Sequence, residues 1–137
     1  MVRARGTGIT FSPRPPYVAT FHSNTDTRIH PRGHLWINHD NPPISIPFDL
    51  PGGFRFAQRA PNDTDGRTAV SIGDKNNPNP NGFNDFGVFL PWPTLSTDGM
   101  TLTLNIKVPD KKFYYYVFNI VGPNGAFSIN DPIIVNR

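Results

Sequence analysis

The chain has 137 residues, of which 17% are charged, 36% hydrophobic and 12% aromatic, with 16 Pro, 12 Gly, no Cys and a net charge of +3. Pro, Gly, Asn and Asp oppose helix formation, and the sequence contains no Glu, so a mainly helical protein is excluded. No apolar run approaches the ~20 residues that cross a bilayer, and the lack of Cys excludes disulfides, thiol nucleophiles and blue-copper ligation. We therefore expect an all-β protein.

Short runs of β-branched and aromatic residues predict strands in the first two thirds of the chain. They are Ile9–Phe11, Tyr17–Phe21, His34–His39, Ile44–Phe48, Phe54–Arg59, Thr68–Ile72 and Gly87–Leu90. Turn-rich segments separate these runs, so that successive strands begin roughly 8–12 residues apart, which is typical of a sandwich or barrel. Pro47 and Pro91 cannot donate to a ladder, so we expect the runs around them to be edges or bulges. The Asn-rich segment 76–84 predicts a long exposed loop.

The C-terminal third has the clearest pattern. Residues 101–108 alternate between polar and apolar, as in a strand with one buried face. The buried face is predicted to consist of Leu102, Leu104, Ile106 and Val108. The solvent-exposed face is predicted to consist of Thr101, Thr103, Asn105 and Lys107. Residues 113–121 are apolar on both faces, as in a central strand. Gly122-Pro123-Asn124-Gly125 predicts a hairpin turn before strands at 126–130 and 132–135. We expect these strands to form an antiparallel meander.

One segment carries a resemblance to a known fold. Residues 110–125 (DKKFYYYVFNIVGPNG) resemble the F strand, turn and G strand of immunoglobulin-like sandwiches, where an Asp precedes a corner Tyr. Tyr114 matches that corner best, and Tyr116 is the alternative. Residues 130–135 (NDPIIV) resemble small bacterial immunoglobulin-like or cupredoxin-like proteins such as the DP-EP family, whose Glu-Pro motif is absent here. The resemblance implies an immunoglobulin-like fold and no activity.

Together these patterns predict one domain. We expect a single antiparallel β-sandwich of about seven to nine strands, immunoglobulin-like with a Greek key, spanning residues 9–137. Residues 1–8 are expected to form a flexible tail. No signal peptide is expected in this sequence, so a soluble protein that stays in the cytoplasm is the default expectation.

Clustered histidines are the first candidate site. All four lie between His22 and His39, and imidazole is a common metal ligand, so His30, His34 and His39 are candidate ligands. Pro31 and Gly33 prevent a helical pair, and a straight strand would place His34 and His39 on opposite faces. A site therefore needs loop geometry, and the alternative is that these are ordinary histidines at strand ends.

Asp63 and Asp65 form a second candidate metal site. Their segment resembles a calcium loop but does not fit the EF-hand pattern, because Pro61 and Ile72 fall where ligands belong. The two carboxylates could hold a lone calcium with backbone carbonyl groups, or they could belong to a solvated turn.

Aromatic residues suggest a different kind of site. The candidates for binding a carbohydrate or another ligand are Trp36, Trp92 and Tyr115. An exposed Trp or Tyr offers a rigid ring for stacking and one polar group for a hydrogen bond. The alternative is that both tryptophans fill the core. The sequence contains no nucleophile elbow, phosphate loop or dinucleotide fingerprint, so no catalytic residue is predicted.

Charge and motif patterns favour a binding protein over an enzyme. Eight of nine Arg lie at or before Arg67 and all four Lys at or after Lys75, but no nucleic-acid-binding motif accompanies them. We predict a non-enzymatic binding or assembly module that forms homo-oligomers or binds a protein partner through sheet edges. The alternatives are a carbohydrate-binding module and a His-ligated metal protein. No cofactor other than such a metal ion, no nucleic acid and no membrane partner is expected.

Overall fold

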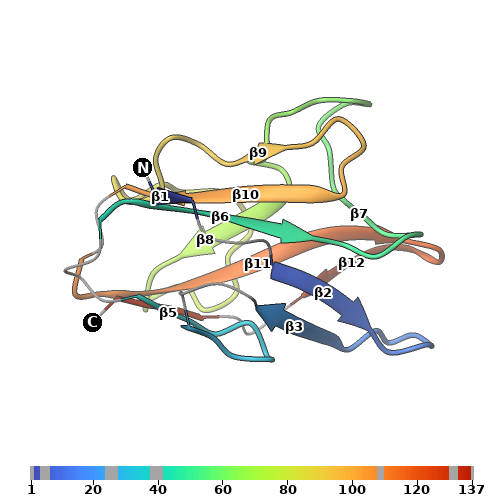
Figure 1. Ribbon diagram of the computed structural model, residues 1–137, viewed down its shortest axis with the longest axis horizontal. Coiled ribbons are helices and arrows are strands. Elements are labelled where there is room, and N and C mark those ends of the chain that lie inside the picture. Colours follow the sequence, from blue (N-terminus) through green and yellow to red (C-terminus); the bar gives the residue numbers. More distant parts are fainter. Residues whose placement is uncertain are drawn as a thin grey trace.

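The described part of this computed structural model covers residues 2–3, 7–23, 28–37, 42–107, 110–129 and 133–136. Within those ranges the chain forms thirteen strands and no helix, so the all-β prediction is confirmed (Figure 1). The strands are β1 (Val2–Arg3), β2 (Thr7–Phe11), β3 (Ala19–Ser23), β4 (Arg28–Ile29), β5 (Leu35–Ile37), β6 (Ile44–Asp49), β7 (Arg55–Phe56), β8 (Val70–Gly73), β9 (Thr94–Leu95), β10 (Thr101–Ile106), β11 (Phe113–Gly122), β12 (Gly125–Ile129) and β13 (Ile133–Asn136).

The first sheet has the strand order β3-β2-β6-β10-β9, and β1 also pairs with β6. One side of β6 pairs with β10 along its whole length. The other side pairs with β1 at Ile44 and Ser45 and with β2 at Phe48 and Asp49. Pro47 falls in the gap between β1 and β2, so the ladder on that side needs no amide hydrogen from it. The prediction that the whole run around Pro47 is an edge is wrong, because β6 is a central strand; only the gap that contains Pro47 lacks a described partner on one side.

The second sheet has the strand order β12-β11-β13-β5-β4, and β7 and β8 also pair with β11. In this sheet β13 is antiparallel to β11 and parallel to β5. Parallel pairs also join β1 and β2 to β6 in the first sheet. Both sheets are thus mixed: most of the paired strands are antiparallel, as predicted, and the parallel pairs were not predicted. Parallel pairs join strands that are distant in sequence, which patterns within single strands do not reveal.

The predicted meander is correct only in its second part. β11 and β12 form the expected hairpin, with Gly122 opposite Gly125, and β13 also pairs with β11. Among the described strands, however, β10 pairs with β6 and β9 and not with β11. The chain therefore changes sheets between Ile106 and Phe113. The prediction of pairing between these two strands is wrong, since strands adjacent in sequence often pair but do not always do so.

The predicted strand Gly87–Leu90 is instead a turn. The amides of Val88 and Phe89 both donate to the carbonyl oxygen of Asp85, at 2.8 and 3.0 Å. Both side chains are buried, so their apolar pattern reflects packing of the turn against the core and not pairing in a sheet.

The N-terminal strand begins before the domain boundary that the sequence suggested at residue 9. Thr7 and Gly8 belong to β2, where they lie opposite Ser23 and His22 of β3. Thr7 is fully buried. Residues 2–3 form β1 and pair with β6.

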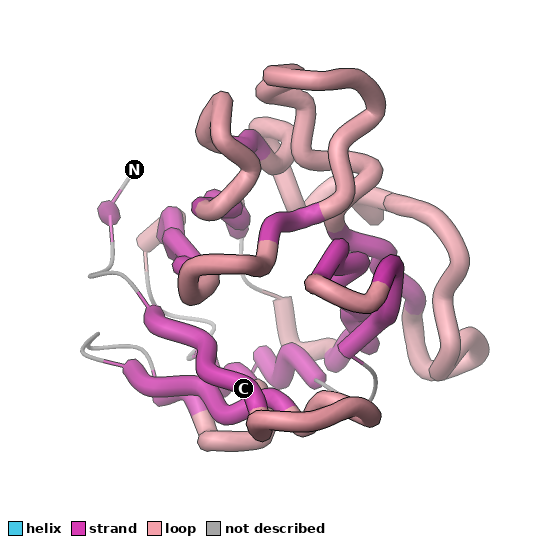
Figure 2. Tube along the Cα trace, turned by 90° about the vertical axis from the view of Figure 1, so that its right-hand side faces the viewer, coloured by secondary structure: helices cyan, strands magenta, loops and turns pink. Residues whose placement is uncertain are grey.

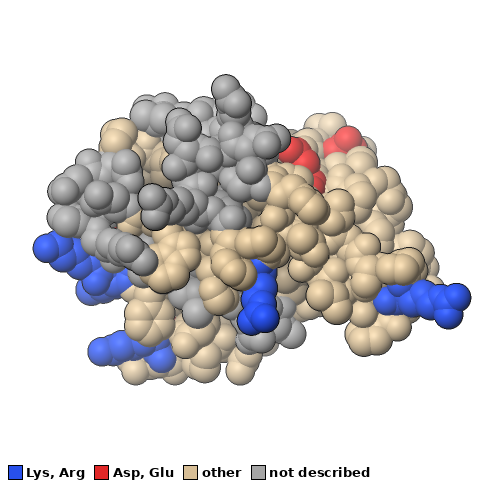
Figure 3. All heavy atoms as spheres, turned by 60° about the horizontal axis from the view of Figure 1, so that its bottom comes forward, with Lys and Arg blue, Asp and Glu red and all other residues tan. Residues whose placement is uncertain are grey.

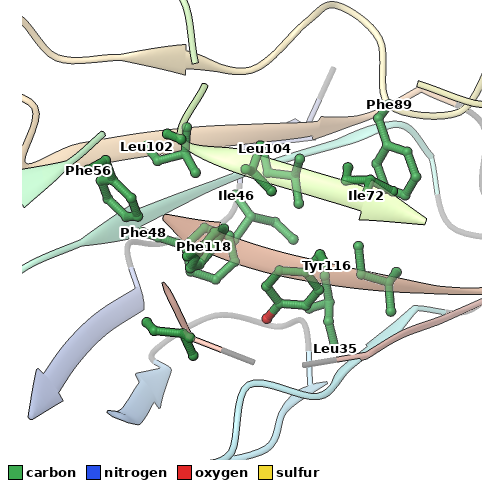
Figure 4. Packing of buried hydrophobic residues seen from close by; sticks show 14 of the residues in the cluster. Leu35, Ile46, Phe48, Phe56, Ile72, Phe89, Leu102, Leu104, Tyr116 and Phe118 are labelled. Atoms are coloured by element: carbon green, nitrogen blue, oxygen red, sulfur yellow. The ribbon is translucent and has the colours of Figure 1, made fainter. Parts of the chain in front are cut away.

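Side chains from the two sheets meet in one buried cluster, which includes residues from Ile9 to Ile134 (Figure 4). The rings of Phe48 on β6 and Phe118 on β11 lie 4.9 Å apart between centroids. In Figure 4, Leu102 and Leu104 lie on the side of the first sheet, and Tyr116 and Phe118 project from β11 in the second. The inward faces of the two sheets therefore share one core.

Two long segments without extended strand structure, residues 57–69 and 74–93, leave the sheets on the way to β8 and β9. Figure 2 shows such loop segments projecting beyond the strands. These two loops carry Asp65, Arg67, Asp85 and Trp92.

Candidate functional site

Trp92 lies on the loop before β9, with 48% of its surface exposed. The guanidinium carbon Cζ of Arg67 lies 3.8 Å from the ring centroid of Trp92, which is a cation–π contact. The indole Nε1 donates a hydrogen bond to Oδ2 of Asp85 at 3.4 Å. The protein thus holds one face and the polar edge of the indole, while about half of the surface of the residue stays exposed.

Asp65 fixes the guanidinium group of Arg67. Arg67 Nη2 donates to Asp65 Oδ2 at 2.7 Å, and Arg67 Nε donates to Asp65 Oδ1 at 3.0 Å. The backbone amide of Arg67 also donates to Asp65 Oδ1. The side-chain bonds first, and the amide second, lower the pKa of Asp65 from 3.8 to about 2. The same pairing raises the pKa of Arg67, so a pair that is charged at neutral pH supports the Trp92 ring.

Asn105 and Gly66 hold the backbone on either side of the indole. The side-chain amide of Asn105 donates to the carbonyl oxygens of Pro91, at 3.0 Å, and Trp92, at 3.4 Å. The amide of Gly66 donates to the carbonyl oxygen of Pro93 at 2.8 Å. The prediction that Asn105 faces water is therefore wrong, because the loop covers this side of β10 and leaves Asn105 only 6% exposed.

Trp36 and Tyr115, the other two predicted ligand-binding residues, belong to the second sheet. Trp36 lies on β5 between the buried residues Leu35 and Ile37, and Tyr115 lies on β11 between two buried tyrosines. Both therefore face away from the core, on strands that flank β13. Phe113 shares the face of Tyr115, and their ring centroids lie 5.7 Å apart. Trp92 lies next to the first sheet, so the structure does not unite the three candidates in one site.

Both tryptophans are exposed, and the alternative that they fill the core is wrong. Trp36 packs against the outer surface of a sheet, whereas Trp92 projects from a loop. Loop-borne side chains with a fixed orientation are a common arrangement in binding sites. Trp92 is therefore the stronger candidate.

His30 and His34 meet in a tight turn, with ring centroids 5.6 Å apart. The amide of His30 donates to the carbonyl oxygen of His34 at 2.7 Å. Nδ1 of His30 accepts a hydrogen bond from the amide of Arg32 at 3.1 Å, which leaves only Nε2 of that ring for a metal. His39, the third candidate, lies outside the described residues. In the ranges that are described, no group of three or more potential metal ligands occurs.

Asp63 and Asp65 point their carboxylates at arginines. Arg59 Nε donates to Asp63 Oδ2 at 2.8 Å, and Asp63 Oδ1 accepts the amide of Asp65 at 2.9 Å. These bonds lower the pKa of Asp63, with the amide of Asp65 as the largest cause. A calcium ion bound here would have to displace the hydrogen bonds from Arg59 and Arg67. The arrangement therefore favours a role for these carboxylates in holding the loop and its arginines.

Charge is dispersed on the face drawn in Figure 3. The Lys and Arg side chains that are drawn lie in separate groups, and the acidic side chains lie near the upper edge of the view. A nucleic-acid backbone requires a continuous basic stripe. The described residues on this face do not form one.

Comparison with protein-family models and with curated proteins gives no match for this chain. A search of the described residues for a helix long and apolar enough to span a membrane finds none.

Proposed function

We propose that this chain is a non-enzymatic binding module that recognises carbohydrate through Trp92, carried on an immunoglobulin-like β-sandwich. The observation that carries the proposal is the half-exposed indole of Trp92, supported on one face by Arg67 and at its edge by Asp85.

Two features support the proposed scaffold. The inward faces of the two mixed sheets share one core, as in a sandwich. The hydroxyl of Tyr114 donates to Oδ2 of Asp110 at 2.6 Å, so the Asp and the Tyr on which the resemblance rests are in contact. Burial, followed by this bond, raises the pKa of Tyr114. Tyr116, the alternative corner residue, donates instead to the carbonyl oxygen of Gly33.

The chemistry of the Trp92 site suits a sugar. One side of a pyranose ring presents mainly C–H groups, which pack against the flat, electron-rich face of an indole. Its hydroxyl groups need hydrogen-bond partners around that platform, and the carboxylate of Asp85 lies at the edge of the indole, whereas Arg67 covers one face of the ring. A platform that is already oriented loses little side-chain entropy when a ligand binds.

A fluorescence titration with cello-, malto-, manno- and xylo-oligosaccharides tests the proposal. We expect at least one series to change the tryptophan emission, and Trp92→Ala to weaken binding about tenfold. Trp36→Phe is the matched control and should bind as the wild type does. Thermal unfolding of both variants checks that each is folded. An unchanged emission across the whole panel, together with no heat of binding by calorimetry, would contradict the proposal.

Self-association is a second candidate, favoured by the outer edge of β12. Among the described strands β12 pairs only with β11, and four of its five residues are not buried. The sheet edges at β3, β4 and β9 are less available for pairing, because β4 and β9 have two residues each and Phe21 of β3 donates to the carbonyl oxygen of Pro31. We expect light scattering at high concentration to give a mass above 15.3 kDa. A strictly monomeric mass would count against this candidate.

A further inference from the structure

A hollow of about 550 Å³, open to solvent, is lined by the end of β8 and by the Asn-rich loop that follows it. Ile72, Phe83 and Phe86 provide its apolar lining. Phe86 is fixed by ring contact with Tyr114 at 5.3 Å between centroids. The volume falls within the roughly 300–1,000 Å³ range of small-ligand sites. The hollow is thus large enough to take a ligand with an apolar face.

Side-chain amides line the same hollow. Asn77, Asn79 and Asn81 are exposed, and their side chains make no hydrogen bond to any of the described residues. Each amide carries two donors and one acceptor, and hydroxyl groups of a neutral sugar can both accept and donate. The described lining contains one charged residue, Asp74, and no Lys or Arg. This lining favours a neutral polyhydroxyl ligand over an anionic one.

The loop that carries these amides is anchored at several points. The amide of Asn77 donates to the carbonyl oxygen of Asp74 at 2.9 Å, and the amide of Ile72 donates to that of Gly82 at 3.0 Å. Gly73 lets the loop approach closely, because a Cβ there would collide with the carbonyl oxygen of Asn77. The hollow is therefore held open by backbone bonds, and binding would require little ordering of the loop.

The hollow and the tryptophan are joined by one residue. Asp85, whose Oδ2 accepts the hydrogen bond from Trp92 Nε1, stands between the lining residues Asn84 and Phe86. Oδ1 of Asp85 accepts the amide of Gly87 at 2.8 Å, which fixes the carboxylate. Consecutive Cα atoms lie about 3.8 Å apart, so two lining residues of the hollow are direct chain neighbours of the residue that holds the indole edge.

From these observations we infer that the hollow is a second subsite for a neutral oligosaccharide, occupied by the unit next to the one stacked on Trp92. This inference rests on the proposed function, because it assumes that the first unit binds at Trp92. It adds that the ligand contains at least two neutral sugar units, and that the amides of Asn79 and Asn81 contact the second.

The test is a titration with cello-, malto-, manno- and xylo-oligosaccharides of one to four units, followed by calorimetry and by ¹⁵N-edited NMR. The indole signal of Trp92 should respond to every length that binds. The side-chain amide signals of Asn79 and Asn81 should respond from the disaccharide upward. Affinity should rise about fivefold from one to four units, as expected for one or two net hydrogen bonds.

The double variant Asn79→Ala/Asn81→Ala should reduce this gain with length to less than about twofold. Asn76→Ala is the matched control, since Asn76 is exposed on the same loop but does not line the hollow, and it should retain the gain. Thermal unfolding checks that both variants are folded.

Two outcomes would overturn the inference in distinguishable ways. In the first outcome, the Trp92 signal responds, but the affinity does not depend on the length of the oligosaccharide and the side-chain amide signals of Asn79 and Asn81 do not change. The second subsite is then wrong and the proposed function stands. If neither Trp92 nor the amides respond to any member of the panel, both are wrong.

Discussion

Asn105 of β10 anchors the loop that carries Trp92. Its buried side-chain amide donates hydrogen bonds to the carbonyl oxygens of Pro91 and Trp92. We expect Asn105→Leu, which keeps the size but removes the donor, to lower the free energy of unfolding by about 1–3 kcal/mol, because a covered carbonyl loses its partner. Urea unfolding measures this loss. Thr103→Val on the same strand is the control and should stay within about 0.5 kcal/mol. Equal midpoints for the two variants would contradict the prediction.

Gly66 allows the segment before β8 to touch the loop of Trp92. A Cβ at this position would lie 2.7 Å from the carbonyl carbon and oxygen of Pro93 and 2.9 Å from Leu102 Cδ1. Gly66→Ala should therefore destabilise the protein by about 1–3 kcal/mol through overpacking. Gly52→Ala is the matched control, because nothing lies within 4 Å of its added Cβ. Thermal unfolding of the pair distinguishes a local clash from a general intolerance of Ala.

Acid should loosen the support of Trp92. The pKa of Asp65 is lowered from 3.8 to about 2 by Arg67, so its pairing stabilises the folded protein above pH 3.8 and is lost as the pH falls toward 2. In Asp65→Asn this contribution is absent at every pH. We expect the melting temperature of the wild type to fall more steeply between pH 4 and 2 than that of the variant. Parallel curves would show that Asp65 does not contribute.

The buried hydroxyl of Tyr116 donates to the carbonyl oxygen of Gly33, in the turn that carries His30 and His34. Tyr116→Phe should cost about 1–3 kcal/mol of unfolding free energy, since the carbonyl loses its partner in the core. Tyr115→Phe, a neighbouring change on the outer face of the same strand, should cost much less. Chemical denaturation of both variants checks this, and equal stabilities would refute it.

The sequence predicts those elements whose pattern is local. In β10 the apolar positions Leu102, Leu104 and Ile106 are buried as their alternation indicates. The long apolar run beginning at Phe113 is a central strand with neighbours on both sides, and the turn at Gly122–Gly125 closes the expected hairpin. Each of these features depends on the spacing of residues within one short segment.

Pairing between distant segments could not be predicted in the same way. The position of β10 in the first sheet and the parallel neighbours of β6 depend on which buried faces meet, and no single strand encodes that choice. The composition of the Trp92 site could not be predicted either, because it too depends on contacts between distant segments. Arg67, Asp85 and Asn105 come from two loops and a strand, and only tertiary folding brings them to the indole. Trp92 itself could be proposed, because the flanking prolines in Pro91-Trp92-Pro93 exclude a regular central strand.

The place of β13 has a consequence for how the protein is made. Its residues emerge from the ribosome after those of the other described strands, yet it is the strand inserted between β11 and β5. Until it has been synthesised, the second sheet remains split into two separate parts, and the buried side chain of Ile134 is missing from the core. Completion of the fold must therefore await the end of translation of this segment, and a nascent chain stalled before Ile133 would expose unfinished edges to chaperones.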